Sequence, residues 1–368
     1  MAATTLAGVA IGASPASAGD PPDRAARIFE VTVEITNLAP ADGTLQTPVW
    51  VGAHDGSFDL YDRGAPISPE LERLAEDGNT GPITELFADS GAGTDSTSTG
   101  GPFAGGETRT ATFLVDTTRG ESQYFSYASM VIPSNDAFVA NGNPTAHKIF
   151  NDRGRFMPVS FIVSGGEVLD AGSEVNDEIP ENTAALAQSA PDTGVTENGV
   201  VTLHEGFQPG GNILAARPGG DFTADGYQAL QIDVTAHRLN SRAAAALRGN
   251  LEVPPVSTQA SGIVRMVLEE DGDIDWSMNA RRIDGVVAAH IHIGQPDENG
   301  PVAALLFSSD PTAGPGLQAS GELTDADMTG PFAGMTTLDL WMAIQAGHAY
   351  VNVHTLDVPS GELRANLP

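Results

Sequence analysis

The chain has 368 residues, of which 48 are acidic and 17 are basic, and its formal net charge is -31. This excess of negative charge disfavours binding to DNA or RNA, so we expect no nucleic-acid partner. Cysteine is absent, which excludes disulfides, thiolate metal sites and cysteine nucleophiles. The acidic residues are dispersed along the chain. We interpret them mainly as a salt-adapted surface, with scattered calcium sites as the alternative.

The first 18 residues are small and apolar and end in Ala16-Ser17-Ala18. This ending is typical of a signal-peptide cleavage site, although the basic segment that opens such a peptide is missing. We therefore interpret residues 1–18 as a partial signal peptide and expect a secreted or cell-surface protein. Further along the chain, no stretch has the roughly 18 consecutive apolar residues of a membrane helix, so no transmembrane segment is expected.

Short runs of alternating apolar residues predict strands along most of the chain, because the side chains of a strand point alternately to its two faces. The predicted strands include 28–35, 113–115, 125–132, 159–163, 230–234, 263–268, 286–293, 303–307 and 349–353. Helices are predicted over 68–76, where Ser-Pro forms a cap and first turn, and over 338–346.

Residues 89–106 are rich in Ser, Thr and Gly and are predicted to form a long loop. The chain is longer than one hydrophobic core usually serves. Together with the strand pattern, its length predicts an all-β protein of two β-sandwich-like domains in series, with a boundary near Ala236.

Two blocks in the first half carry a family resemblance. Residues 128–139 read Ala-Ser-Met-Val-Ile-Pro-Ser-Asn-Asp-Ala-Phe-Val, and residues 169–174 read Leu-Asp-Ala-Gly-Ser-Glu. In order and spacing they resemble spondin amino-terminal domains, and the resemblance spans residues 27–236. It implies a β-sandwich that binds calcium through loop carboxylates and carbonyls.

The resemblance makes Asp136 the first calcium candidate, because it occupies the acidic position of the family's motif. Glu107, just ahead of a neighbouring predicted strand, is its proposed partner. A second candidate is the cluster of Asp170 and Glu174 with the two acids that follow them, Asp177 and Glu178. The alternative for each of these residues is a solvated surface carboxylate in a chain that is rich in them.

Four separated blocks in the second half resemble chordin-type (CHRD) domains. They are Leu-Glu-Val-Pro-Pro-Val at 251–256, Ala-His-Ile-His-Ile-Gly at 289–294, Asn-Gly-Pro-Val at 299–302, and Tyr-Val-Asn-Val-His-Thr at 350–355 followed by Gly-Glu-Leu-Arg at 361–364. The resemblance covers residues 238–367. It implies a β-rich extracellular module of matrix or cell-surface proteins.

Histidines in these blocks form a possible transition-metal site. His290 and His292 are two residues apart on a predicted strand and therefore point to the same face, and His354 lies on a later strand. Three imidazoles on one sheet face can bind copper or zinc, and the His-x-His strand is similar to the copper-binding strand of copper-zinc superoxide dismutases. The alternative is a structural role, with the rings hydrogen-bonded to Glu252, Asn352 or Thr355.

The sequence lacks the serine-nucleophile elbow, the zinc-protease helix motif and the phosphate-binding loop. We therefore predict a secreted or cell-surface, calcium-supported binding or adhesion protein without catalytic activity, whose partner is an extracellular protein or polysaccharide. The alternative function is a copper- or zinc-dependent, superoxide-dismutase-like enzyme that uses His290, His292 and His354.

Overall fold

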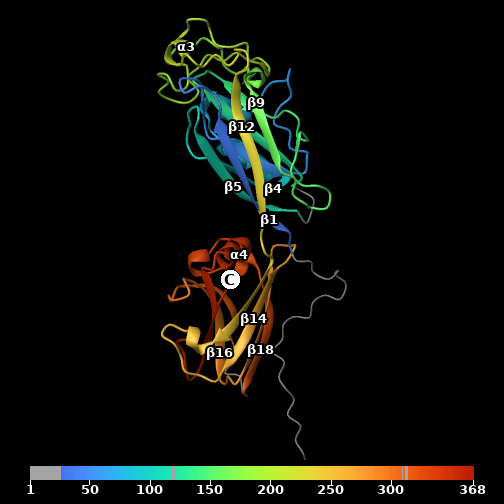
Figure 1. Ribbon diagram of the computed structural model, residues 1–368, viewed down its shortest axis with the longest axis vertical. Coiled ribbons are helices and arrows are strands. Elements are labelled where there is room, and N and C mark those ends of the chain that lie inside the picture. Colours follow the sequence, from blue (N-terminus) through green and yellow to red (C-terminus); the bar gives the residue numbers. More distant parts are fainter. Residues whose placement is uncertain (1–25, 118–121, 309, 311–313) are drawn as a thin grey trace, which may run out of the picture. The chain divides into compact units, whose positions relative to one another are not determined.

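The computed structural model describes residues 26–117, 122–308, 310 and 314–368. The predicted signal peptide, residues 1–18, lies outside the described residues. The chain divides into two compact units, which we call the first unit (Arg27–Arg238) and the second unit (Leu239–Pro368, with Ala26). Strands dominate both units, which confirms the all-β prediction (Figure 1).

The first unit contains a four-stranded antiparallel sheet in the order β5-β1-β12-β9. These strands are β5 (Thr108–Asp116), β1 (Ile28–Asn37), β12 (Gln228–Arg238) and β9 (Val159–Ser164). Alternate residues of β1, namely Val31, Val33 and Ile35, are fully buried, as expected for a sheet with one face on the core.

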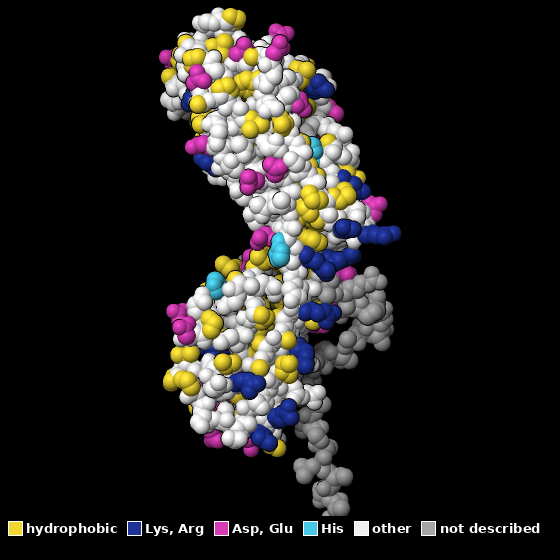
Figure 2. Space-filling model, in the orientation of Figure 1, with side chains coloured by type: hydrophobic (Ala, Val, Ile, Leu, Met, Phe, Trp, Pro, Cys, Tyr) yellow, Lys and Arg dark blue, Asp and Glu magenta, His cyan; other side chains and the backbone are white. Residues whose placement is uncertain are grey.

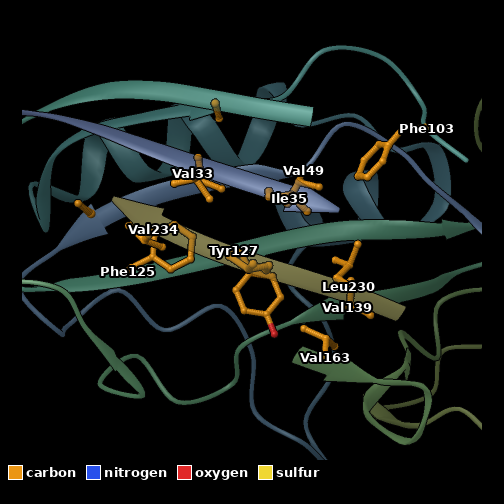
Figure 3. Packing of buried hydrophobic residues seen from close by; sticks show 14 of the residues in the cluster. Val33, Ile35, Val49, Phe103, Phe125, Tyr127, Val139, Val163, Leu230 and Val234 are labelled. Atoms are coloured by element: carbon orange, nitrogen blue, oxygen red, sulfur yellow. The ribbon is translucent and has the colours of Figure 1, made fainter. Parts of the chain in front are cut away.

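A second, larger sheet of the first unit has the order β11-β10-β7-β6-β3-β4, with two short strands also paired to β6. The members are β11 (Thr202–Leu203), β10 (Leu169–Asp170), β7 (Ala137–Ala140), β6 (Tyr124–Ile132), β3 (Trp50–His54), β4 (Gly93–Ser98), β2 (Leu45–Gln46) and β8 (His147–Lys148). The two sheets enclose the main core. Figure 3 shows Val33 and Val234 of the first sheet packed near Phe125 and Tyr127 of the second.

Helices cover the other face of the second sheet. They are α1 (Pro69–Asp77) and α2 (Gly81–Ser90), and the unit also has a short α3 (Asn212–Ala216) and a 3-10 turn, η1 (Gly165–Glu167). Leu71 and Leu74 of α1 pack with Trp50 and Phe138 of the sheet in a separate cluster. As a consequence β6, which lies between the two cores, is buried at eight of its nine positions.

The α1 helix confirms the prediction for this segment. Its N-cap, Ser68, accepts a hydrogen bond from the backbone N–H of Leu71, and Pro69 occupies the first turn. Two neighbouring elements were not predicted. Helix α2 was missed because its helical pattern is weak. Strand β4 lies inside the segment predicted as a loop. Its residues Gly-Thr-Asp-Ser-Thr-Ser show no apolar alternation, and the strand forms by pairing with β3.

The second unit is built on one antiparallel sheet of eight strands, in the order β17-β16-β19-β20-β13-β14-β15-β18, which curls into a barrel-like shape (Figure 1). The strands are β13 (Arg242–Arg248), β14 (Ser261–Leu268), β15 (Ile274–Arg281), β16 (Val286–Ile293), β17 (Val302–Ser308), β18 (Gly316–Leu323), β19 (Ala349–Thr355) and β20 (Leu363–Asn366). The helical segments are α4 (Thr337–Gln345), η2 (Gly249–Leu251), η3 (Asp325–Asp327) and η4 (Gly330–Phe332).

Inward-pointing residues of these strands, among them Val264, Met266 and Val353, form the buried interior of the second unit. Helix α4, which confirms the second predicted helix, contributes the fully buried Trp341. The indole N–H of Trp341 donates to the backbone carbonyl of Asn240 at 2.9 Å, so this large ring is buried without losing its hydrogen bond. Among the described residues, no helix has the length and apolar character needed to cross a membrane.

Each unit has its own core, so we expect fragments 27–238 and 239–368 to fold separately. Each fragment should show a cooperative thermal transition by differential scanning calorimetry, at a temperature close to one of the transitions of the full chain. If neither fragment shows a cooperative transition while the full chain does, the division into two domains is contradicted.

Candidate metal centre

A polar face lies on the outer side of β16, β19 and β20. In the antiparallel register His290 is opposite Asn352, and Asn352 is opposite Arg364 on the next strand. His292 is in the same way opposite Tyr350. Neighbouring inward-pointing residues are fully buried apolar side chains, so the period of two along each strand turns these polar side chains to the outer face.

Three imidazoles converge on this face. His290 and His292 come from β16 and His354 comes from β19, and one ring nitrogen of each lies within 4.8 Å of one ring nitrogen of the others. The ring centroid of His290 is 5.7 Å from that of His292 and 4.9 Å from that of His354. The structure therefore brings together the three histidines that the sequence pattern singled out.

Backbone carbonyls fix the orientation of two of these rings. Nδ1 of His292 bonds to the carbonyl oxygen of Gly300 at 2.9 Å, and Nδ1 of His354 bonds to that of Pro359 at 2.9 Å. A carbonyl only accepts, so each Nδ1 carries a proton, and in the neutral ring Nε2 then has a free lone pair. Nε2 of both rings and Nδ1 of His290 are buried and have no hydrogen-bond partner among the described residues.

A stack of three side chains supports His292 from behind. Its ring lies 4.9 Å from the ring of Tyr350 and only 9° from parallel to it, and the guanidinium of Arg364 sits 3.4 Å from the Tyr350 ring centre. The Tyr350 hydroxyl accepts a hydrogen bond from the backbone N–H of Gly300 at 2.9 Å. Tyr350 thus holds both the ring of His292 and the residue whose carbonyl orients it.

Gly300 must be a glycine in this arrangement. A methyl group at this position would collide with the carbonyl oxygen of Ile293, so only the bare backbone can approach the end of β16 so closely. This close approach places the Gly300 carbonyl beside His292.

The pKa values of His290 and His292 favour the neutral form of these two rings. Burial, helped by the neighbouring His354 and His292, lowers the pKa of His290 to about 4. Burial also lowers the pKa of His292, with smaller contributions from His354 and Arg364. Neutral imidazole is the form that binds a metal ion, so this face presents metal-binding nitrogens at neutral pH.

A buried carboxyl group bonds to Asn352, the residue opposite His290 in the strand register. Glu252 is 5 % exposed, its Oε2 accepts from the side-chain amide of Asn352 at 3.1 Å, and its Oε1 has no hydrogen-bond partner among the described residues. Burial raises the pKa of Glu252 to about 7, although the charge of Arg364 opposes the shift.

The calcium candidates of the first unit occupy a different environment. Asp136 is fully buried, and its Oδ2 accepts from the backbone N–H of Ser173 at 2.9 Å and from that of Glu174 at 3.0 Å. Its Oδ1 has no hydrogen-bond partner among the described residues. Burial and the nearby charge of Asp170 raise the pKa of Asp136 to about 7.

Glu174 belongs to a group of three acids with Glu76 and Asp192, whose oxygens lie within 4.8 Å of one another. Glu174 is 2 % exposed, and its Oε2 has no hydrogen-bond partner among the described residues. Burial and the charge of Glu76 raise the pKa of Glu174 to about 7. Arg73 is the cation of this group, 3.2 Å from Glu76 and 3.7 Å from Asp192.

The remaining predicted calcium residues have other partners. Glu107 is exposed and pairs with Arg109 at 3.3 Å, and it does not join a group with Asp136. Asp170 accepts from the backbone N–H of Gly172 at 2.7 Å and from the Asn176 amide at 2.6 Å.

The next two acids along the chain, Asp177 and Glu178, hold loop segments in place through hydrogen bonds. Asp177 accepts from the backbone N–H of Ile179 and from the Asn182 amide. Glu178 is buried and accepts from the backbone N–H of Gln208 at 2.5 Å.

Sequence reasoning missed several residues of both sites. Glu76 and Asp192 are far from Glu174 in sequence and gave no motif that could have found them. Tyr350 was identifiable, because counting back in steps of two from His354 places it on the same strand face. Arg364 was part of a family block, but its complete burial against Tyr350 has no signal in the sequence.

The pH dependence of stability should reveal the buried carboxyl of Glu252. Its folded pKa, about 7, lies above its ordinary value of 4.5, so the folded state binds the proton more tightly and this group destabilises the fold increasingly as pH rises from about 4.5 to about 7. In Glu252→Gln that loss is absent. The melting temperature of the variant minus that of the wild type should therefore grow between pH 4.5 and pH 8 in calorimetry; a constant difference would contradict the assignment.

Comparison with known proteins gives one family assignment. No curated protein matches the chain, and the spondin resemblance of residues 27–236, which no match to that family supports, stays a prediction. Residues 243–367 match the model of the CHRD domain family, a family of extracellular β domains. The three converging histidines therefore lie in the part of the chain that matches the CHRD domain family.

Proposed function

We propose that the chain is an extracellular metal-binding protein whose CHRD domain holds one copper or zinc ion through His290, His292 and His354. Two observations carry this proposal: the three imidazoles converge, and each has one buried ring nitrogen that lacks a hydrogen-bond partner among the described residues. Leaving such polar atoms unsatisfied costs free energy unless a ligand binds them, and a metal ion satisfies all three at once.

The type of donor supports copper or zinc. Imidazole nitrogens suit zinc and copper, whereas calcium and magnesium prefer oxygen. Carbonyl groups that fix the second ring nitrogen, as Gly300 and Pro359 do here, are the usual outer partners of metal-binding histidines. Three protein ligands leave a coordination position for water or for a group from a partner.

The proposed role is binding rather than turnover. The superoxide-dismutase-like enzyme remains the alternative, because copper held by imidazoles with an open position can exchange electrons with a small substrate. The two functions differ in one measurement. The copper-loaded chain should not accelerate superoxide dismutation above the rate of the His354→Gln variant incubated with the same copper.

Metal binding itself is tested with the full chain and Zn²⁺ or Cu²⁺ added alone. One ion per chain should bind, measured by elemental analysis after dialysis and by competition with a chelator. Removal of an outer partner of a metal ligand typically lowers the affinity by roughly 10–100-fold. His354→Gln removes a ligand itself, so its affinity should fall by more than this. The control His237→Gln changes an exposed histidine and should bind the metal as the wild type does. Tyr350→Phe keeps the stack but loses the bond to Gly300, so about tenfold weaker binding is expected. Equal binding by all four proteins would contradict the site.

Calcium support of the first unit is a second proposed function. Its supporting observation is the pair of buried carboxylate oxygens, Asp136 Oδ1 and Glu174 Oε2, that lack hydrogen-bond partners among the described residues. Burial and the charge of Asp170 raise the pKa of Asp136, and burial and the charge of Glu76 raise the pKa of Glu174. A divalent cation would offset this repulsion and supply the missing contacts.

Calcium should therefore raise the melting temperature of the first unit relative to the same protein in chelator. A ligand at a hundredfold excess over Kd stabilises the folded state by about 2.7 kcal/mol. Glu174→Gln should lose this increment, while Glu197→Gln, an exposed acid of the same region, should keep it. Asp136→Ala is less informative, because it also removes hydrogen bonds to Ser173 and Glu174. An identical calcium response in all variants would refute the site.

A further inference from the structure

Arginines gather on the outer face of β13, β14 and β15 in the second unit. Arg242 and Arg248 lie on β13, Arg265 on β14 and Arg281 on β15, and all four are exposed. We call this surface the arginine face. Four of the 17 basic residues of a chain with 48 acidic ones lie on it. Figure 2 shows basic side chains along the side of the second unit where Figure 1 labels β14 and β18.

The strand register fixes how the arginines are spaced. Arg248 is opposite Ser261, which is opposite Arg281 on the next strand. Arg248 and Arg281 are therefore two strand spacings apart, about 10 Å. Arg265 lies four residues from Ser261 along β14, about 13 Å away. These guanidinium groups stand in an array on a rigid sheet rather than on mobile loops.

Among the described residues of β13, β14, β15 and β18 that point outward, the acidic ones lie at one end of this face. Asp275 and Glu322 lie opposite each other in the row that contains Arg242. The row of Arg265 is otherwise uncharged, and the row of Arg248 contains two further charged residues, Arg281 on β15 and the buried Arg364 on β20, both of them basic. Their other outward positions, and those of the row between them, include Ala244, Ala246, Ser261, Ser277, Asn279 and Gln318. Among the described residues, none of the four arginines forms a salt bridge, so their positive charge is available to a ligand.

We propose that the arginine face binds a linear polysaccharide that carries carboxylate groups. Guanidinium matches the planar carboxylate through two parallel hydrogen bonds. A repeating polymer can engage several arginines at once, which multiplies weak single contacts into useful affinity. The face is broad and, among its outward positions in the described residues, carries no aromatic side chain, unlike the apolar, aromatic centre of a typical protein–protein interface.

Charge density separates this ligand from nucleic acid. Duplex DNA carries one negative charge per about 1.7 Å, and such a polymer is repelled by the rest of a chain with net charge -31. A polysaccharide with one carboxylate per sugar ring is far less dense in charge. Because the Debye length is about 8 Å near 0.15 M salt, the polysaccharide interacts mainly with the charges of the arginines that it contacts, and the repulsion from distant acidic residues is screened.

The test measures binding of a fluorescent alginate oligomer to the full chain by anisotropy, in chelator so that no metal ion bridges carboxylates. The variant replaces Arg248, Arg265 and Arg281 with Gln. The matched control replaces Arg63, Arg153 and Arg155, three exposed arginines of the first unit, with Gln. Both triples change the net charge equally, and calorimetry verifies that both fold.

The wild type should bind alginate at 150 mM NaCl, bind it more weakly at 1 M, and not bind neutral dextran. The arginine-face triple should bind at least about tenfold more weakly, and the control triple within about twofold of the wild type. Equal losses in the two triples, no binding by the wild type, or equally tight binding of a DNA duplex would each overturn the proposal. Because metal ions are absent, the result does not depend on the histidine site.

Discussion

The candidate metal centre depends on the alternation of side chains along three neighbouring strands. On β16, β19 and β20 every second residue enters the apolar interior, and the residues between them form one polar outer face. A shift of register by one residue would exchange these two sets. Burial of the aliphatic side chains, such as Ile291 and Val353, thus sets the strand register, and the register sets the positions of the histidines.

The loops that close over this face convert a row of polar residues into an organised site. Arg364 is fully buried, and its guanidinium donates to Asn366, Asn299 and the carbonyl of Gln295 while it rests on the ring of Tyr350. These contacts satisfy a cation that would otherwise be costly to bury. They also tie the loop after β16 to the sheet, so one arginine stabilises both the loop and the stack behind His292.

The sequence predicted what depends on local periodicity and missed what depends on long-range pairing. Period-two alternation identified β16 with its bounds as found, and the Ser-Pro start identified α1. The strand β4 has no apolar pattern and exists because β3 pairs with it, so no local signal could reveal it. The histidine group was predictable because two members share a strand. Glu76 and Asp192, by contrast, come to Glu174 only through the tertiary fold.

The burial of β6 on both faces has a consequence for the dynamics of the first unit. This strand contacts the core between the two sheets with Phe125 and Val131, and the helix-covered core with Ala128. Its amides open to solvent only when both cores separate, whereas the edge strand β4 can open by losing its pairing to β3. We therefore expect amide hydrogen exchange to be slowest in β6, at the free energy of global unfolding of the unit, and faster in β4 through local opening.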